Sequence, residues 1–166
     1  TKLAYLDCGE NYIETLNFTG CQALEELYCD TNKLSSLDVR GLTALTYLNC
    51  KVNSLTSLNA SGLTALEEIQ CYENDLTALN VSGCSSLAKL NCSENNLAAL
   101  NLSGLTALEY LDCNDNALTS LNVSGLTALE ELYCVENELT SLNVSGCSSL
   151  IILYCDANKL TSLDLS

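Results

Sequence analysis

The sequence predicts a solenoid of eight stacked coils, because one pattern recurs along the whole chain. The chain has 166 residues, and its repeats follow one another every 21 residues without a linker or a low-complexity segment between them. Such a fixed short period is typical of solenoid proteins, in which each repeat is stabilised mainly by its neighbours. The repeats begin at Leu3, Leu24, Leu45, Leu66, Leu87, Leu108, Leu129 and Leu150. We therefore expect a single domain over residues 1–166.

Within each repeat, the spacing of the apolar residues predicts one short strand. The pattern is LxxLxCxxNxLxxL(N/D)xSG(L/C)xx, in which the fourth-position leucine and the sixth-position cysteine alternate with variable residues. Alternation of this kind buries one face of a strand, and stacking of the repeats pairs the strands in parallel. About a dozen residues remain for the return to the next strand, which predicts an extended or 3₁₀ path. The pattern is typical of leucine-rich repeats, an α/β class by convention, with the parallel sheet on the concave face.

The repeat also predicts two buried ladders of identical side chains. The asparagine after each strand lies where the chain turns, so its amide can bond backbone groups that the bend leaves unpaired. The predicted asparagine ladder consists of Asn11, Asn32, Asn53, Asn74, Asn95, Asn116, Asn137 and Asn158. The predicted cysteine ladder consists of Cys8, Cys29, Cys50, Cys71, Cys92, Cys113, Cys134 and Cys155.

The cysteines are expected to be reduced and buried. Cys21, Cys84 and Cys147 replace a leucine of the sister repeats, which marks an apolar position. A disulfide framework fits poorly because the total of 11 is odd and the spacing is periodic. A metal site also fits poorly because there is no CxxC pair and no histidine.

The charge balance restricts the class of partner. The chain has 21 acidic and 6 basic residues, a net charge of −15, which disfavours nucleic acid and anionic membranes and favours a basic protein. No apolar stretch is long enough to insert into a membrane. The apolar fraction of 48% is enough for a core.

The variable positions concentrate acids and tyrosines on one predicted face. The second, third, fifth, seventh and eighth positions hold 16 of the 21 acids and seven of the eight tyrosines. Tyrosine gives rigid contact area, and carboxylates between tyrosines suit lysine or arginine side chains. The candidate binding residues are Tyr5, Glu26, Tyr28, Tyr47, Glu68, Tyr72, Tyr110, Asp112, Glu131, Tyr133 and Tyr154. The alternative is that these positions only keep the sheet soluble.

Catalysis, cofactors and metals are not expected. There is no histidine, and the ladder thiols should be too buried to react. The eighth-position acids Glu73, Glu94, Asp115 and Glu136 occupy successive coils, but a Ca²⁺ site wants six to eight oxygens and no dense D-x-D loop is present. We therefore predict neither a catalytic residue nor a metal site.

The 21-residue pattern with one cysteine per coil resembles the cysteine-ladder leucine-rich repeats of bacterial surface proteins of the internalin family. The resemblance covers essentially the entire chain and implies an extracellular or cell-surface adhesion module. The alternatives are a structural spacer and an engineered repeat scaffold with no specific ligand. No polar cap is evident at either end, so we expect the chain to be part of a larger protein or to associate end to end with a second copy.

Overall fold

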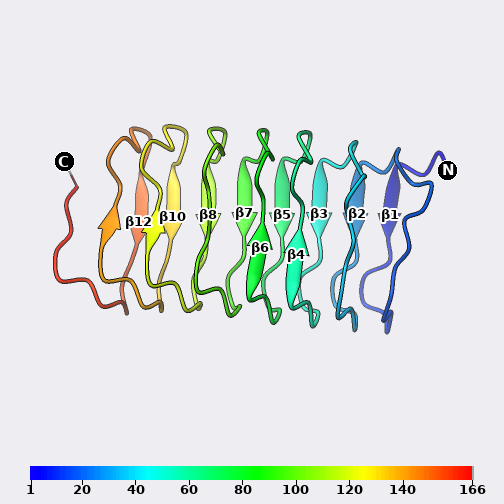
Figure 1. The fold of residues 1–166 in the computed structure, drawn as a ribbon, viewed down its shortest axis with the longest axis horizontal. Helices are drawn as coiled ribbons and strands as arrows, with labels where there is room; N and C mark the ends of the chain where they lie inside the picture. Colours follow the sequence, from blue (N-terminus) through cyan, green and yellow to red (C-terminus); the bar gives the residue numbers. More distant parts are fainter. Residues whose placement is uncertain (166) are drawn as a thin grey trace.

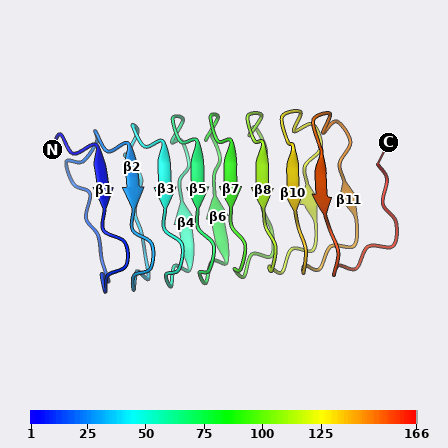
Figure 2. The same ribbon diagram turned by 180° about the vertical axis from the view of Figure 1, so that it is seen from behind.

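In the computed structural model, which describes residues 1–165, the chain forms a solenoid with one continuous parallel sheet along its length (Figures 1 and 2). The sheet has eight strands, in the order β1-β2-β3-β5-β7-β8-β10-β12. These strands are β1 (Tyr5–Asp7), β2 (Glu26–Tyr28), β3 (Tyr47–Asn49), β5 (Glu68–Gln70), β7 (Lys89–Asn91), β8 (Tyr110–Asp112), β10 (Glu131–Tyr133) and β12 (Ile152–Tyr154). Seven complete coils join them, and the eighth ends with the sequence, which confirms the predicted repeat architecture.

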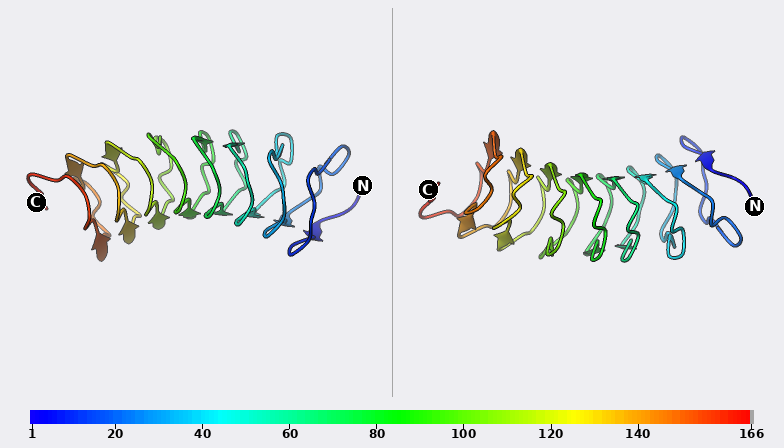
Figure 3. Two further views of the ribbon diagram at one scale, coloured as in Figure 1. Left: turned by 90° about the horizontal axis from the view of Figure 1, so that it is seen from below. Right: turned by 90° about the horizontal axis from the view of Figure 1, so that it is seen from above.

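The register stacks equal positions of successive repeats on one another. Tyr5 pairs with Glu26 and Leu6 with Leu27, and the same offset of 21 residues holds in every pair of neighbouring strands. Each third- or fifth-position side chain therefore lies beside the third- and fifth-position side chains of the adjacent coils. Figure 3 shows that the solenoid bends gently, with the eight-stranded sheet on the inner side of the curve.

The return side of the solenoid is extended and contains two short parallel sheets. These pair β4 (Ser57–Asn59) with β6 (Ala78–Asn80), and β9 (Leu121–Asn122) with β11 (Leu142–Asn143). An isolated bridge joins Asn143 to Asp164.

The extended alternative for the return path is therefore correct, and the 3₁₀ alternative is not. Throughout residues 1–165 there is no α- or 3₁₀-helix, and accordingly none that could span a membrane. Successive tight turns replace the 3₁₀ segment: in the fourth coil the amide of Cys84 donates to Val81 and that of Leu87 to Cys84. These turns let the chain reverse in few residues, and Gly83, inside the first of them, has a φ of +79°, which an L-residue adopts at a cost.

The core is a stack of leucines and cysteines between the two sides. The first- and fourth-position apolar side chains are buried from Leu24 to Leu132, and so are the six ladder cysteines from Cys29 to Cys134. All 11 cysteines are free. Cys71, for example, places its Sγ 3.4 Å from the carbonyl oxygen of Asn91 in the next coil. The sixth position therefore packs as a small apolar group with a weak donor, as predicted.

The asparagine ladder connects each turn to the preceding coil. The Nδ2 of Asn74 donates to the carbonyls of Cys71 and Tyr72 in its own coil and to that of Cys50 in the coil before, at 3.1–3.3 Å. Its Oδ1 accepts the amide of Leu55 at 3.0 Å. The same pattern recurs at the other internal asparagines, for example Asn32 and Asn95, so each side chain satisfies four backbone groups at once.

Candidate binding face

The outward side of the eight-stranded sheet, here called the sheet face, is formed by the third and fifth positions of each coil. In β2 the middle residue Leu27 is buried, whereas Glu26 and Tyr28 on either side are partly exposed. The alternation follows from the strand itself, because successive side chains point to opposite faces. Ten of the eleven predicted binding residues occupy these positions. They are Tyr5, Glu26, Tyr28, Tyr47, Glu68, Tyr110, Asp112, Glu131, Tyr133 and Tyr154.

The eleventh predicted residue, Tyr72, lies two residues after the end of β5. The Lys51 ammonium group lies over its ring, 5.3 Å from the centroid. Tyr72 therefore stands at the edge of the sheet face in a cation–π contact with the neighbouring coil.

The tyrosines of the sheet face form two stacks. Tyr28 lies between Tyr5 and Tyr47, with ring centroids 5.4 and 4.8 Å apart. At the other end of the sheet, Tyr133 lies between Tyr110 and Tyr154, at 5.6 and 5.3 Å. These separations are those of favourable aromatic pairs. The outermost rings, Tyr5 and Tyr154, are each 53% exposed.

Carboxylates are held against the tyrosine stacks by hydrogen bonds. The hydroxyl of Tyr28 donates to Glu26 at 3.0 Å, and that of Tyr133 donates to Glu131 at 2.8 Å. Desolvation, followed by the hydrogen bond to Glu26, raises the pKa of Tyr28 to about 12. At Tyr133 the hydrogen bond to Glu131 is the largest cause of a raised pKa. These phenols are therefore protonated at neutral pH and keep donating.

Asp112 is an acid of the sheet face whose own pKa is raised by partial burial. Desolvation raises its pKa above the usual value, although the amide of Asn114 and the hydroxyl of Tyr110 lower it by donating hydrogen bonds. In return, desolvation and the charge of Asp112 raise the pKa of Tyr110 to about 12.

Two shallow hollows of about 330 and 350 Å³ lie side by side between the tyrosine stacks. Glu68 and Lys89 line both hollows. The other acids of the first hollow are Glu26 and Glu67, and those of the second are Glu109, Glu130 and Glu131. Lys89 is the one basic residue in the eight strands, so it interrupts an otherwise acidic surface.

The eighth position of each coil is a turn with left-handed backbone. Its φ is between 50° and 53° in all eight coils, including Thr31 and Val52, whose branched side chains disfavour this conformation. Glu136 has a raised pKa, caused first by its hydrogen bond to Asp115 and then by that residue's charge. No group of three or more potential metal ligands occurs among residues 1–165.

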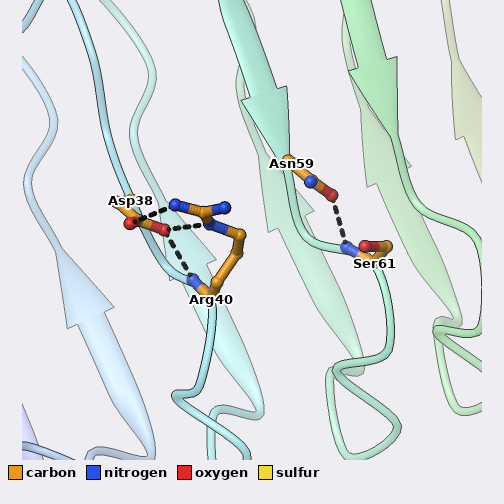
Figure 4. A network of polar contacts seen from close by, with 4 residues as sticks. All are labelled: Asp38, Arg40, Asn59 and Ser61. Atoms are coloured by element: carbon orange, nitrogen blue, oxygen red, sulfur yellow. Dashed lines mark hydrogen bonds and ion pairs between the residues drawn. The ribbon is translucent and has the colours of Figure 1, made fainter.

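The return side carries polar residues that cap their own turns. Asp38 accepts two hydrogen bonds from Arg40, one from the Nε at 2.8 Å and one from the backbone amide at 3.1 Å (Figure 4). Asn59 accepts the backbone amide of Ser61 at 3.0 Å. The hydrogen bonds from the side chain and the amide of Arg40, with a smaller contribution from its charge, lower the pKa of Asp38 to about 2. These oxygens serve local turns, as Asp7 and Asp112 also do on the sheet face, whereas Glu26 and Glu131 accept tyrosine hydroxyls.

The pairing of Glu26 with Tyr28 and of Glu131 with Tyr133 was not predicted from the sequence. A signal was present: residues 23–29 and 128–134 both read ALEELYC, and no other coil has this sequence. Lys89 was also not singled out, although it stands alone among the strand positions.

Neither a protein-family model nor a curated protein matches the chain, but solved structures do. The functional domain of InlJ from Listeria monocytogenes, which includes a cysteine ladder, is 30% identical with a TM-score of 0.55, over 99% of this chain and 46% of that one. The leucine-rich-repeat protein LIC12759 from Leptospira interrogans is 28% identical with a TM-score of 0.87, over 97% and 45%.

YopM from Yersinia enterocolitica is 25% identical with a TM-score of 0.76, over 93% of this chain and 32% of that one. The chain thus spans less than half the length of each of these three relatives. Together with the 21-residue coils and both buried ladders, the similarity establishes the kind of protein. The chain is a leucine-rich-repeat solenoid with a cysteine ladder, similar to that of the InlJ domain.

Proposed function

We propose that this chain is a non-enzymatic protein-binding or adhesion module that uses the sheet face to bind a basic protein. The observation that carries the proposal is the composition of that face, where carboxylates lie between stacked tyrosines on the inner side of the curve. A concave, rigid surface with aromatic anchors and one sign of charge favours complementary recognition. The resemblance to internalin repeats supports a place outside a bacterial cell or on its surface.

The chemistry of the candidate nucleophiles supports a binding role over catalysis. Burial raises the pKa of Cys50 and Cys92 to about 12, so these thiols are protonated at neutral pH. A thiol reacts through its thiolate, and an enclosed thiol also excludes its substrate. The acids lie on an open face, where they can pair with cations of a partner.

Charge reversal tests the proposal. The variant Glu26→Lys, Glu68→Lys, Glu131→Lys should lose binding to the basic probe protein cytochrome c in calorimetry at low salt, because the attraction comes from these positions. The matched control reverses three exposed acids away from the sheet face, with Glu14→Lys, Asp75→Lys and Glu138→Lys. Both variants have the same net charge, and the control additionally breaks the exposed ion pair of Glu138 with Lys159, which contributes little to stability. The control should retain probe binding, with both melting temperatures near wild type.

Equal losses in the two variants would contradict recognition by the sheet face. That result would favour the alternative that the solenoid is a structural spacer whose surface charge only maintains solubility.

We also propose that the solenoid can associate end to end. At the last coil, Ile151 is 77% and Leu165 67% exposed, and an apolar hollow of about 470 Å³ lies between them and Val144. Light scattering should then show dimers at high concentration that the variant Ile151→Glu abolishes. A monomer at all concentrations would refute the association.

A further inference from the structure

The sheet face contains the same local structure twice. Tyr133 follows Tyr28 by 105 residues, which is five repeats of 21, and both lie in the sequence ALEELYC. Each is the middle ring of a stack of three, and each donates its hydroxyl to the glutamate two residues earlier. We call Tyr5, Tyr28, Tyr47 and Glu26 the N-terminal platform. Tyr110, Tyr133, Tyr154 and Glu131 form the C-terminal platform.

The chemistry of a platform suits a cationic side chain. A ring face attracts a guanidinium or ammonium group, and the adjacent carboxylate supplies a charge-assisted partner. The protein already makes the first of these contacts within its own chain, because Lys33 lies 5.1 Å from the Tyr12 centroid and Lys51 lies 5.3 Å from that of Tyr72. The hydroxyl of each central tyrosine holds its glutamate beside the rings, which reduces the ordering needed on binding.

The strands between the platforms have a different character. β5 and β7 present Glu68, Gln70, Lys89 and Asn91, without an aromatic residue. Lys89 repels a cation at this point, although acids line the hollows on both sides of it. Ring faces next to carboxylates therefore occur only at the two ends of the sheet face, whereas the middle offers carboxylates around one lysine and no aromatic residue.

We propose that the two platforms are equivalent subsites, each binding one arginine- or lysine-bearing segment of the same partner. The inference rests on the proposed function, since it specifies the partner of the same sheet face. Five coils at about 4.8 Å place the subsites about 24 Å apart, which about seven residues of extended chain can span at about 3.3 Å each. The partner is thus an extended basic segment with two cationic groups at that separation.

Two peptides of equal length and charge test the spacing. One has arginine pairs at positions 1–2 and 8–9, joined by glycine and serine. The other has its four arginines contiguous, followed by the same glycines and serines. The spaced peptide should bind about tenfold tighter or better in calorimetry, because its second contact becomes intramolecular. Equal affinity of the two peptides would overturn the inference, because general attraction to a negative protein does not depend on spacing.

Variants assign the two contacts. Tyr28→Ala and Tyr133→Ala should each reduce the affinity for the spaced peptide to that of the contiguous one, while Tyr12→Ala should leave it unchanged. Tyr12 is a matched control because it is 82% exposed and lies outside the strands. Glu26→Gln and Glu131→Gln keep all six rings, and each should reduce the affinity for the spaced peptide by the same factor. They provide the same test if an alanine variant is unstable.

The outcomes separate this inference from the proposed function. If variants of only one platform, or of neither, change the affinity for the spaced peptide, the proposal of two equivalent subsites is refuted. Loss of cytochrome c binding on reversal of the sheet-face acids would still support the proposed function in that case. Stacking of a neutral oligosaccharide on the rings, with no preference for the peptides, would overturn the assignment of a basic partner.

Discussion

At the scale of single residues, the asparagine ladder has the largest predicted effect on stability. The Nδ2 of Asn95 donates to Cys71, Cys92 and Ser93, and its Oδ1 accepts the amide of Leu76 at 2.9 Å. Asn95→Ala leaves these buried backbone groups without their partner. A buried unsatisfied group costs about 1–3 kcal/mol, so we expect a loss of about 3 kcal/mol or more in the free energy of unfolding, measured with urea.

The neighbouring residue provides the control for this experiment. Asn96 is exposed, and Asn96→Ala should change the free energy of unfolding by no more than about 0.5 kcal/mol. Similar losses at both positions would show that the ladder contributes no more than a surface amide does.

At the scale of elements, the strands of the main sheet were predictable and the short strands of the return side were not. Leucine and cysteine at the fourth and sixth positions alternate with variable residues in every coil, so one buried face is specified everywhere. On the return side, the sequence TSLN precedes a valine in coils six and seven and contains β9 and β11. In the second coil the similar SSLD, at residues 35–38, forms no strand. Pairing there depends on the neighbouring coils rather than on local sequence.

The turn after each strand shows a second limit of the sequence. Repetition revealed that the eighth position is variable, but its left-handed backbone could not be inferred from residues such as Val52 and Thr31, which disfavour it. The asparagine that follows imposes the turn by binding the carbonyls of the sixth and seventh positions. Stacking over the whole array thus determines the conformation against local preference.

For the candidate binding residues too, the sequence predicts their positions in the strands but not the contacts between their side chains. The alternation of the strands was enough to place ten of the eleven on the sheet face. Three of the four ring contacts in the two stacks are diagonal, between a third and a fifth position, as between Tyr28 and Tyr47, whereas Tyr133 and Tyr154 face each other in the fifth position. Such contacts depend on side-chain direction, which column-by-column inspection of a repeat does not give.

At the scale of the whole molecule, the cysteine ladder should make the folded chain lose stability at alkaline pH. Burial raises the pKa of all six ladder thiols from Cys29 to Cys134, to about 12 at Cys50, Cys92 and Cys134. The usual value is 9.0. The folded chain therefore keeps protons that the unfolded chain releases above pH 9, so stability is full below pH 9 and falls as pH rises toward 12.

The size of this effect distinguishes the ladder from ordinary surface titration. Each thiol lowers the free energy of unfolding by about 1.4 kcal/mol per pH unit in that range, and six together by about 8 kcal/mol per unit. Because domains are stable by only about 5–15 kcal/mol, we expect unfolding near pH 10 to 11. Urea melts under reducing conditions at pH 8, 9 and 10 should show the steepening. In Cys92→Ala the free energy of unfolding should fall less steeply with pH above pH 9, by the contribution of one thiol, because the surface charges are unchanged. An unaltered slope would show that the thiols do not control alkaline stability.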